Sequence, residues 1–468
     1  MKTIILSIPY SMSARNLLRS EAFSRLSKTF KVVILTPLHK DENFLREFSR
    51  ENVVIKGLPK QHSLFFKVFR RALDIIEGCY FTQKTRLDTL LILEQCLKRS
   101  RPLTYWSRKA IGATFRPLLH TMRGLQGRFL CSSYYEDLLN EFAPSLVFLS
   151  HPIALEEFSI AFTARKKAVP VIALIHSWDN ITAKSGIRTV TSNRPGRMLP
   201  MHFDKVIVWN KIVKKEIIDC YDYKSYDVFV TGVPQFDYYY NNDFSDRDTF
   251  IKQIGADPSK KLLLYSAGSP FILPKQDEVI EGLVKALQDN RFVVPSQLLI
   301  RTLPGADMTA VKEKYSKYKD VYVYQPAIAN AAVAYNSGWQ SGEESQRSLP
   351  ESLLASDVTM NVTSTMSLDS VVLDRPTICI GFDGFENSSY YDSVVKHYDY
   401  THYSNVMKTG GVQLAKSPDE LISKINDYLK DPKMDSEGRE RLRREQCYKV
   451  DGKAGVRIAS FIVDFTKK

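Results

Sequence analysis

A polar loop directly follows an apolar run in the first half of the chain and carries two candidate proton acceptors. The run "VPVIALI" (169–175) leads into His176, and Asp179 follows His176 by three positions. Histidine titrates near neutral pH, and an aspartate accepts a proton where its position and partial burial favour it. The two side chains indicate a general base for a hydroxyl group. The alternatives are a structural hydrogen bond for His176 and a turn or helix cap for Asp179.

Two loops in the second half have the composition of phosphate-binding loops. Gly268 and Ser269 follow the apolar run "LLLY", where a glycine turn can present backbone N–H groups. Residues Thr363, Ser364 and Thr365 precede a helix predicted to begin near Met366, and hydroxyl and N–H groups at such a place suit a diphosphate. A simple turn at Gly268 and an ordinary helix cap at Ser364 or Thr365 are the alternatives.

Three further polar residues lie at the ends of predicted strands or one helical turn beyond. Arg301 follows "LLI" and can pair with a phosphate or with a structural carboxylate. Asp369 can accept hydrogen bonds from a ribose or be solvated. His151, in "LSHP", is a second candidate base.

Short runs rich in Val, Ile and Leu alternate with amphipathic segments and must position these loops. Such alternation is typical of parallel sheets covered on both faces. We predict a doubly wound α/β domain over 1–240, interrupted by a helical insertion over about 61–142, and a second over 241–450. A closing helix over 451–468 can cross back to the first domain. Ligands of open α/β sheets bind beyond the carboxyl ends of the strands, so we expect the polar loops of both domains to face a shared cleft.

Composition agrees with a soluble two-domain protein. The 468 residues exceed what one hydrophobic core organises, and 44% are hydrophobic and 25% charged. No apolar run approaches the roughly 20 residues of a membrane-spanning helix. The N-terminal run "IILSI" meets Pro9 at once, which favours a first strand over a targeting segment. The six scattered cysteines favour free thiols in a reducing cytoplasm over disulfides or zinc.

The positive charge is concentrated in the predicted insertion. Residues 60–130 contain 14 Lys and Arg against 4 Asp and Glu, which accounts for +10 of the net +13. Aromatic side chains such as Phe65, Phe69 and Trp106 are interleaved with these cations. Such a helical face suits an anionic membrane surface. A solvated cationic face is the alternative, and no nucleic-acid-binding motif is present.

Two segments resemble known nucleotide-sugar enzymes. "ASDVTMNVTSTMSLDSVVLDRPTICIGFD" (355–383) resembles the nucleotide-binding segment of GT-B glycosyltransferases and of the CDP-glycerol glycerophosphotransferases. "DGKAGVRIASFI" (451–462) is similar to the closing helix of the latter group. "HSWDNITAKSG" (176–186) occupies the place of their Trp-His-Gly loop, whose histidine is a candidate base. The resemblance extends over roughly 140–240 and 260–465.

The resemblance implies a GT-B fold and a bacterial enzyme that transfers a sugar from a nucleotide-sugar donor to a cell-surface glycan or lipid-linked saccharide. It implies no cofactor besides that substrate. No Glu-x7-Glu pattern is evident, and no Asp-x-Asp metal motif ends a strand, so we expect inversion without a metal. The expected roles are catalysis for His176 and Asp179, acceptor binding for Trp178, Lys184 and His151, and donor binding for Gly268, Ser269, Arg301, Thr363, Ser364, Thr365 and Asp369.

Three other functions stay open on sequence alone. The closing helix favours transfer of a polyol phosphate from a CDP-linked donor. A UDP-sugar 2-epimerase shares the two-domain plan, but a soluble sugar nucleotide does not require a basic insertion. A GT-B-like scaffold that binds glycan without catalysis is the third. For the transferase we expect a cytoplasmic location, peripheral at the inner face of the cell membrane.

Overall fold

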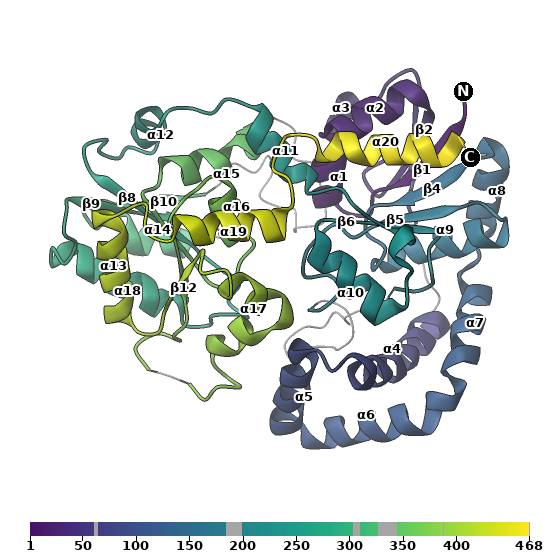
Figure 1. Ribbon diagram of the computed structural model, residues 1–468, viewed down its shortest axis with the longest axis horizontal. Coiled ribbons are helices and arrows are strands. Elements are labelled where there is room, and N and C mark those ends of the chain that lie inside the picture. The colour runs from purple at the N-terminus through teal and green to yellow at the C-terminus, as the bar shows by residue number, and fades with distance from the viewer. Residues whose placement is uncertain (60–63, 184–198, 303–308, 326–343, 387, 468) are drawn as a thin grey trace. The chain divides into compact units, whose positions relative to one another are not determined.

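The computed structural model describes residues 1–59, 64–183, 199–302, 309–325, 344–386 and 388–467. These residues form two compact units (Figure 1). Unit 1 contains Met1–Tyr238 and Tyr448–Lys468, and unit 2 contains the described residues between Tyr239 and Cys447. Each unit is built on its own parallel sheet.

The sheet of unit 1 has, within the described residues, seven strands in the order β3-β2-β1-β4-β5-β6-β7, all parallel. The strands are β1 (Thr3–Ser7), β2 (Lys31–Thr36), β3 (Val53–Gly57), β4 (Leu146–Leu149), β5 (Val171–Leu174), β6 (Lys205–Val208) and β7 (Val228–Val230). Ile4 of β1 is opposite Val32 of β2 on one side and Leu146 of β4 on the other. The strand order therefore reverses at β1, which makes the gap between β1 and β4 the place where such sheets bind ligands.

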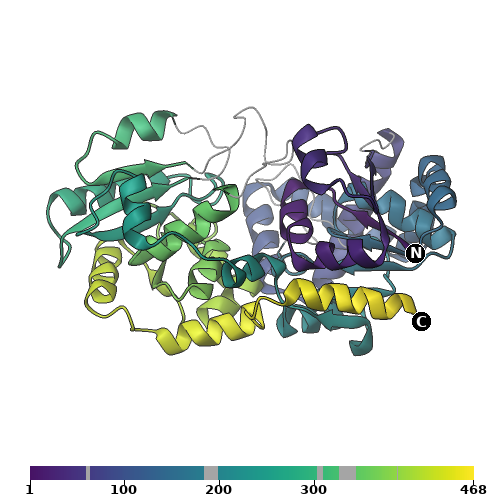
Figure 2. The same ribbon diagram turned by 90° about the horizontal axis from the view of Figure 1, so that it is seen from above.

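One face of this sheet is covered by the first helices and by the last one. Alternate residues of β1, Ile4 and Leu6, pack with buried side chains of α1 (Ser11–Leu18), α2 (Glu21–Thr29), α3 (Glu42–Phe48) and α20 (Ala454–Lys467). Helix α20 lies along α2 (Figure 2), so close that a Cβ atom at Gly455 would come 2.9 Å from the backbone nitrogen of Ala22. The carboxylate of Asp237 accepts hydrogen bonds from the first two N–H groups of α20, at 2.9 and 2.7 Å.

The helical insertion predicted from the sequence is confirmed. It consists of α4 (Leu64–Thr85), α5 (Asp88–Ser100), α6 (Pro102–Phe115), the 3-10 turn η1 (Arg116–Leu118), α7 (Leu119–Leu130) and α8 (Ser133–Phe142). A buried guanidinium holds it together: Arg70 of α4 pairs with Asp74 and Glu77 and hydrogen-bonds Gln126 of α7. The remaining helices of unit 1 are α9 (Leu155–Lys166), α10 (Lys211–Tyr221), η2 (Ser225–Asp227) and α11 (Pro234–Asn241), which leads into unit 2.

The sheet of unit 2 has, in the part described, six parallel strands in the order β10-β9-β8-β11-β12-β13. They are β8 (Lys261–Ser266), β9 (Ser296–Arg301), β10 (Val321–Tyr324), β11 (Val358–Asn361), β12 (Thr377–Ile380) and β13 (Gln413–Ala415). The helices are α12 (Arg247–Gln253), α13 (Gln276–Gln288), α14 (Thr309–Tyr315), α15 (Glu344–Ala355), α16 (Met366–Val372), η3 (Val394–Asp399), α17 (Thr401–Met407), α18 (Pro418–Lys430) and α19 (Ser436–Cys447). The strand order reverses at β8, so the reversal lies between the neighbouring strands β8 and β11.

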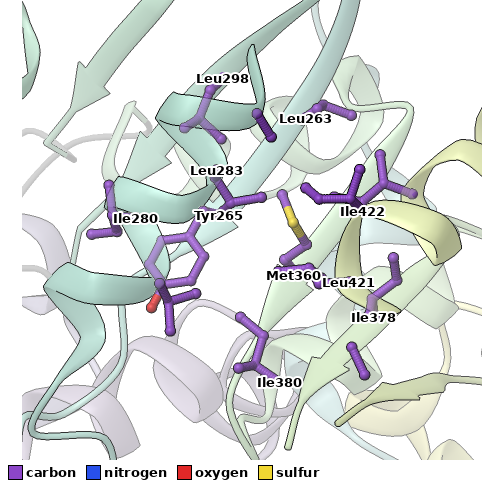
Figure 3. Packing of buried hydrophobic residues seen from close by; sticks show 14 of the residues in the cluster. Leu263, Tyr265, Ile280, Leu283, Leu298, Met360, Ile378, Ile380, Leu421 and Ile422 are labelled. Carbon is purple, nitrogen blue, oxygen red and sulfur yellow. The ribbon is translucent and has the colours of Figure 1, made fainter. Parts of the chain in front are cut away.

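Both faces of this second sheet are buried. Leu263 and Tyr265 of β8 point to one face, where they pack with α13 and α18 side chains such as Leu283 and Ile422 (Figure 3). Leu262 and Leu264 point to the other face, toward α12 and α15. The prediction of two doubly wound parallel domains is therefore confirmed for each unit.

Candidate functional site

The carboxyl edge of the unit 1 sheet gathers aromatic and titratable side chains from three neighbouring strands. Tyr10 follows β1, His151 follows β4 and His176 follows β5. The rings of His151 and His176 lie 3.9 Å apart between centroids, with planes tilted by 41°. Tyr10 meets His151 edge-on at 4.8 Å. The parallel register thus brings the two predicted histidines into direct contact at the reversal of strand order.

Glutamates in the first turn of α9 fix the loop that carries His151. Both oxygens of Glu157 accept backbone hydrogen bonds, from Ser150 at 3.2 Å and His151 at 3.0 Å. Burial raises the pKa of Glu157 to about 8, although these N–H groups act in the opposite direction. The hydroxyl of Tyr10 donates to Glu156 at 3.2 Å. Neither glutamate could be singled out from the sequence, because nothing in their spacing distinguishes them from an ordinary acidic first turn of a helix.

The loop after β5 is a compact turn with most of its side chains inside. His176 is 7% and Trp178 4% exposed, so the Trp178 ring is packed rather than displayed as an open stacking surface. Ser177 donates a hydrogen bond to Asp179 at 2.5 Å, and the Asp179 carbonyl accepts the N–H of Ala183. Asp179 therefore has a turn-forming role besides any chemistry. Lys184, a predicted acceptor-binding residue, lies outside the described residues.

A third glutamate that could not be singled out from the sequence, Glu216, lies on α10. Burial raises the pKa of Glu216 to about 8, and the nearby charge of Asp179 adds to the rise. Within the described residues, the buried Oε2 atom of Glu216 has no hydrogen-bond partner. A glutamate in the middle of a predicted surface helix carries no sequence signal of burial. Among the described residues of unit 1, burial therefore raises the pKa of both Glu157 and Glu216.

In unit 2, the loop after β8 is open around its glycine. A Cβ atom at Gly268 would meet no atom of the described residues within 4 Å. The hydroxyl of Ser269 accepts the N–H of Phe271 at 3.3 Å. The loop therefore has space for a ligand to approach the backbone.

The loop after β11 is organised by Asn361, which sequence analysis did not single out. Its side-chain oxygen accepts hydrogen bonds from Ser364 N at 3.3 Å and Ser367 Oγ at 3.1 Å. Ser364 Oγ in turn accepts the N–H of Met366 at 3.2 Å, whereas Thr365 makes no side-chain cap. Thr363 has a left-handed backbone with φ of 36°, which is unusual for a β-branched residue. The Ser364 hydroxyl therefore already has the capping role that was the alternative to phosphate binding.

Two predicted donor-binding residues have protein partners. The guanidinium of Arg301 reaches the carbonyl and hydroxyl oxygens of Ser348 at 3.4 and 3.3 Å, and burial lowers its pKa to about 10. Asp369 is 3% exposed and accepts a hydrogen bond from Tyr239 at 2.8 Å. Neither is a solvated surface residue, because Arg301 is 6% and Asp369 3% exposed.

Three further observations concern metals, thiols and membranes. Among the described residues, no group of three or more His, Cys, Asp or Glu is placed to hold a metal ion. None of the six cysteines, all of which are described, forms a disulfide. In the same part of the chain, no helix combines the length and apolar character needed to cross a bilayer.

Comparisons with known proteins reveal similarity at the level of structure. No family model and no curated protein sequence matches the chain. A UDP-N-acetylglucosamine 2-epimerase from Listeria monocytogenes, described as putative, superposes with a TM-score of 0.57 at 11% identity, over 100% of this chain and 97% of the other. S. aureus MnaA, solved with UDP, gives 0.56 at 12% identity over the same shares. The wall teichoic acid polymerase TagF gives 0.50 at 13% identity, over 100% and 89%.

The chain has the GT-B fold. Identities of 11–13% establish the architecture and not the reaction. The epimerase and the polymerase named above differ in the reaction that their names give, although they share this fold. The reaction of this protein must therefore be inferred from the residues at the strand ends of unit 1 and unit 2.

Proposed function

We propose that this protein is a nucleotide-sugar-dependent glycosyltransferase that inverts the anomeric centre, needs no metal and acts on a glycan or lipid-linked saccharide acceptor. The observation that carries the proposal is the contact of His151 with His176 at the carboxyl edge of unit 1. A neutral imidazole there can take the proton of an acceptor hydroxyl as the glycosidic bond forms. Asp179 is the alternative base on the same turn.

In this proposal the donor is held by unit 2. The open backbone at Gly268 and the hydroxyl and N–H groups of 363–365 bind the diphosphate, which leaves with the electron pair of the broken bond. Arg301 and Asp369 are the remaining proposed donor-binding residues, and each also has a protein partner. Similar structures solved with UDP or UDP-GlcNAc favour a uridine nucleotide.

We propose that the basic insertion binds the enzyme to a membrane surface. Residues 61–130 would lie against an anionic membrane at the inner face of the cell membrane, where a lipid-linked acceptor is presented. Nucleic acid is not a proposed partner.

A second candidate, UDP-sugar 2-epimerase, is favoured by the TM-scores of two structures named as UDP-N-acetylglucosamine 2-epimerases, 0.57 and 0.54 against 0.50 for the polymerase. An epimerase needs no acceptor, so the two functions predict different products. Transfer of a polyol phosphate from a CDP-linked donor and glycan binding without catalysis are the remaining alternatives.

One experiment separates these functions. The protein is incubated with UDP-, GDP-, CDP- and CMP-sugars and with CDP-glycerol, with and without glycan acceptors, and nucleotide release and sugar identity are measured. Acceptor-dependent nucleotide release supports the transferase. Epimerised sugar nucleotide without acceptor supports the epimerase, turnover of CDP-glycerol supports the phosphate transferase, and glycan binding without turnover supports the scaffold.

A further inference from the structure

Helix α6 exposes an apolar face at the outer margin of the insertion, beyond α4 (Figure 1). Leu103 is 87% and Trp106 59% exposed, and Ala110 and Ala113 continue the stripe at helical spacing. Across the described chain, nine of the seventeen exposed large hydrophobic side chains lie within 64–134. Such clustering marks an interaction surface rather than scattered surface residues.

The charged residues of α6 are not on this face. Arg108 and Lys109 are half-buried on the inner side, and no acidic residue occurs on the helix. The exposed Arg116 of η1 is directed toward the insertion, because its guanidinium lies over the ring of Tyr80 and donates to Gln83. The outward face is therefore uncharged: Leu103, Trp106, Ala110 and Ala113 lie there with the hydroxyl residues Thr104, Ser107 and Thr114, whereas an ordinary surface helix displays charged side chains.

Packing holds α6 in this orientation. A Cβ atom at Gly112 would lie 2.6 Å from the Cβ atom of Cys79, so α6 and α4 touch at the glycine. Lys109 pairs with Glu94 of α5 at 2.7 Å. Rotation of Leu103 and Trp106 inward would break both contacts.

The charge around this face identifies its partner. Residues 95–135 contain eight Lys and Arg and no Asp or Glu. Lys98 lies over the Trp106 ring at 5.8 Å, so a cation borders the apolar stripe directly. In a two-fold interface with a second copy, these like charges would face one another and repel. Nucleic acid would meet an uncharged apolar face instead of a cationic groove.

We propose that α6 lies flat on an anionic lipid bilayer, with Leu103 and Trp106 at the boundary of headgroups and acyl chains. Lys98, Arg99 and Arg101 contact lipid phosphates beside them. A second apolar group is Phe65 of α4 with Phe129 of α7, whose ring centroids lie 5.3 Å apart. The inference rests on the membrane location in the proposed function and names the surface and lipid chemistry responsible.

The test is co-sedimentation of the full-length protein with vesicles in which about a third of the lipids are anionic, without nucleotide or acceptor. We expect Leu103→Glu to weaken binding roughly tenfold or more, and Arg99→Gln with Arg101→Gln to weaken it about fivefold for each charge. The matched control, Val293→Glu, places the same charge at a 45% exposed apolar residue of unit 2 and should bind like the parent. Neutral vesicles should bind the parent weakly.

Two further measurements complete the test: the depth of Trp106 in the bilayer and the oligomeric state of the protein. In a Trp339→Phe background, which removes the tryptophan outside the described residues, brominated acyl chains should quench part of the tryptophan emission, and Trp106→Phe should remove that part, because Trp178 and Trp209 are buried. Undiminished vesicle binding by Leu103→Glu overturns the proposal, as does a change of oligomeric state in light scattering with unchanged vesicle binding, which would indicate a second copy. Because no sugar nucleotide is present, failure of the transferase assay and failure of vesicle binding are separate results.

Discussion

His151 and His176 come from different strand ends, yet their imidazole rings are in contact at 3.9 Å. The contact exists because β4 and β5 are adjacent and parallel, so their carboxyl ends open on the same side of the sheet. Tyr10, from β1, closes the group on the side of the strand-order reversal. A proton acceptor placed there can be tested by substitution.

We expect His176→Ala and Asp179→Ala to fold normally and at least one of them to lose more than roughly 100-fold in turnover, because the base is removed from the acceptor hydroxyl. Initial rates and circular dichroism check both parts. The control is His202→Ala, since His202 is exposed and precedes β6 at the opposite edge of the sheet. Full activity in both variants would refute the assignment of the base to this turn.

Gly268→Ala should leave stability unchanged, because the added Cβ atom meets no atom within 4 Å in the part of the chain that the structure describes. If the diphosphate contacts this backbone, the methyl group should weaken nucleotide binding by roughly tenfold, measured by calorimetry. Gly282→Ala adds a methyl group to α13 in similarly open space and should bind nucleotide like the parent. Equal affinities in both variants would count against a donor site at this loop.

Glu157→Gln should flatten the pH dependence of stability of unit 1. The pKa of Glu157 rises from 4.5 to about 8 on folding, so the folded state binds more protons between these values. The contribution of this carboxyl group to stability is then fully present below pH 4.5 and is lost as pH rises toward 8. Urea unfolding followed by emission of the buried Trp178 and Trp209 measures the slope. Glu216 contributes the same sign, so the variant should reduce the slope without abolishing it. An unchanged slope would show that Glu157 is ionised in the folded protein.

In unit 2, one histidine should contribute a pH dependence of stability opposite to that of Glu157, because its contribution is lost in acid. Burial lowers the pKa of His397 from 6.5 to about 3, so the unfolded state binds more protons between these values. The contribution of this histidine to stability is therefore lost as pH falls from about 6.5 toward 3. His397→Gln should reduce the acid sensitivity, measured by hydrogen exchange of the described amides of unit 2. Identical acid sensitivity in the variant would assign the effect to other groups.

Asp237→Ala should destabilise unit 1 by roughly 1–2 kcal/mol, because the first N–H groups of α20 lose their acceptor. Asp464→Ala, near the other end of α20, removes an exposed carboxylate paired with Lys467 and should have almost no effect. Urea unfolding of both variants gives the comparison. Equal stabilities would show that the helix start does not depend on Asp237.

The sequence by itself determined the strands and the polar loops that end them. Runs such as "IALI" and "LLIR" are apolar over enough residues to be buried strands, and polar residues must follow where each strand leaves the sheet. His151, His176 and Gly268 could therefore be located at strand ends before any coordinates. These signals are local, so spacing along the chain was sufficient to read them.

Only the tertiary structure decided which groups meet and which face inward. Arg301 and Asp369 are buried with partners at Ser348 and Tyr239 that lie far away in sequence. Glu157 and the Oε2 atom of Glu216 are buried by neighbouring elements that their own helices do not specify. The apolar stripe of α6 would predict a core-facing side, but Gly112 is the residue that packs on α4, and Leu103 and Trp106 point outward. Helical periodicity shows that a helix has two faces, and the packing of the rest of the chain determines which of them meets water.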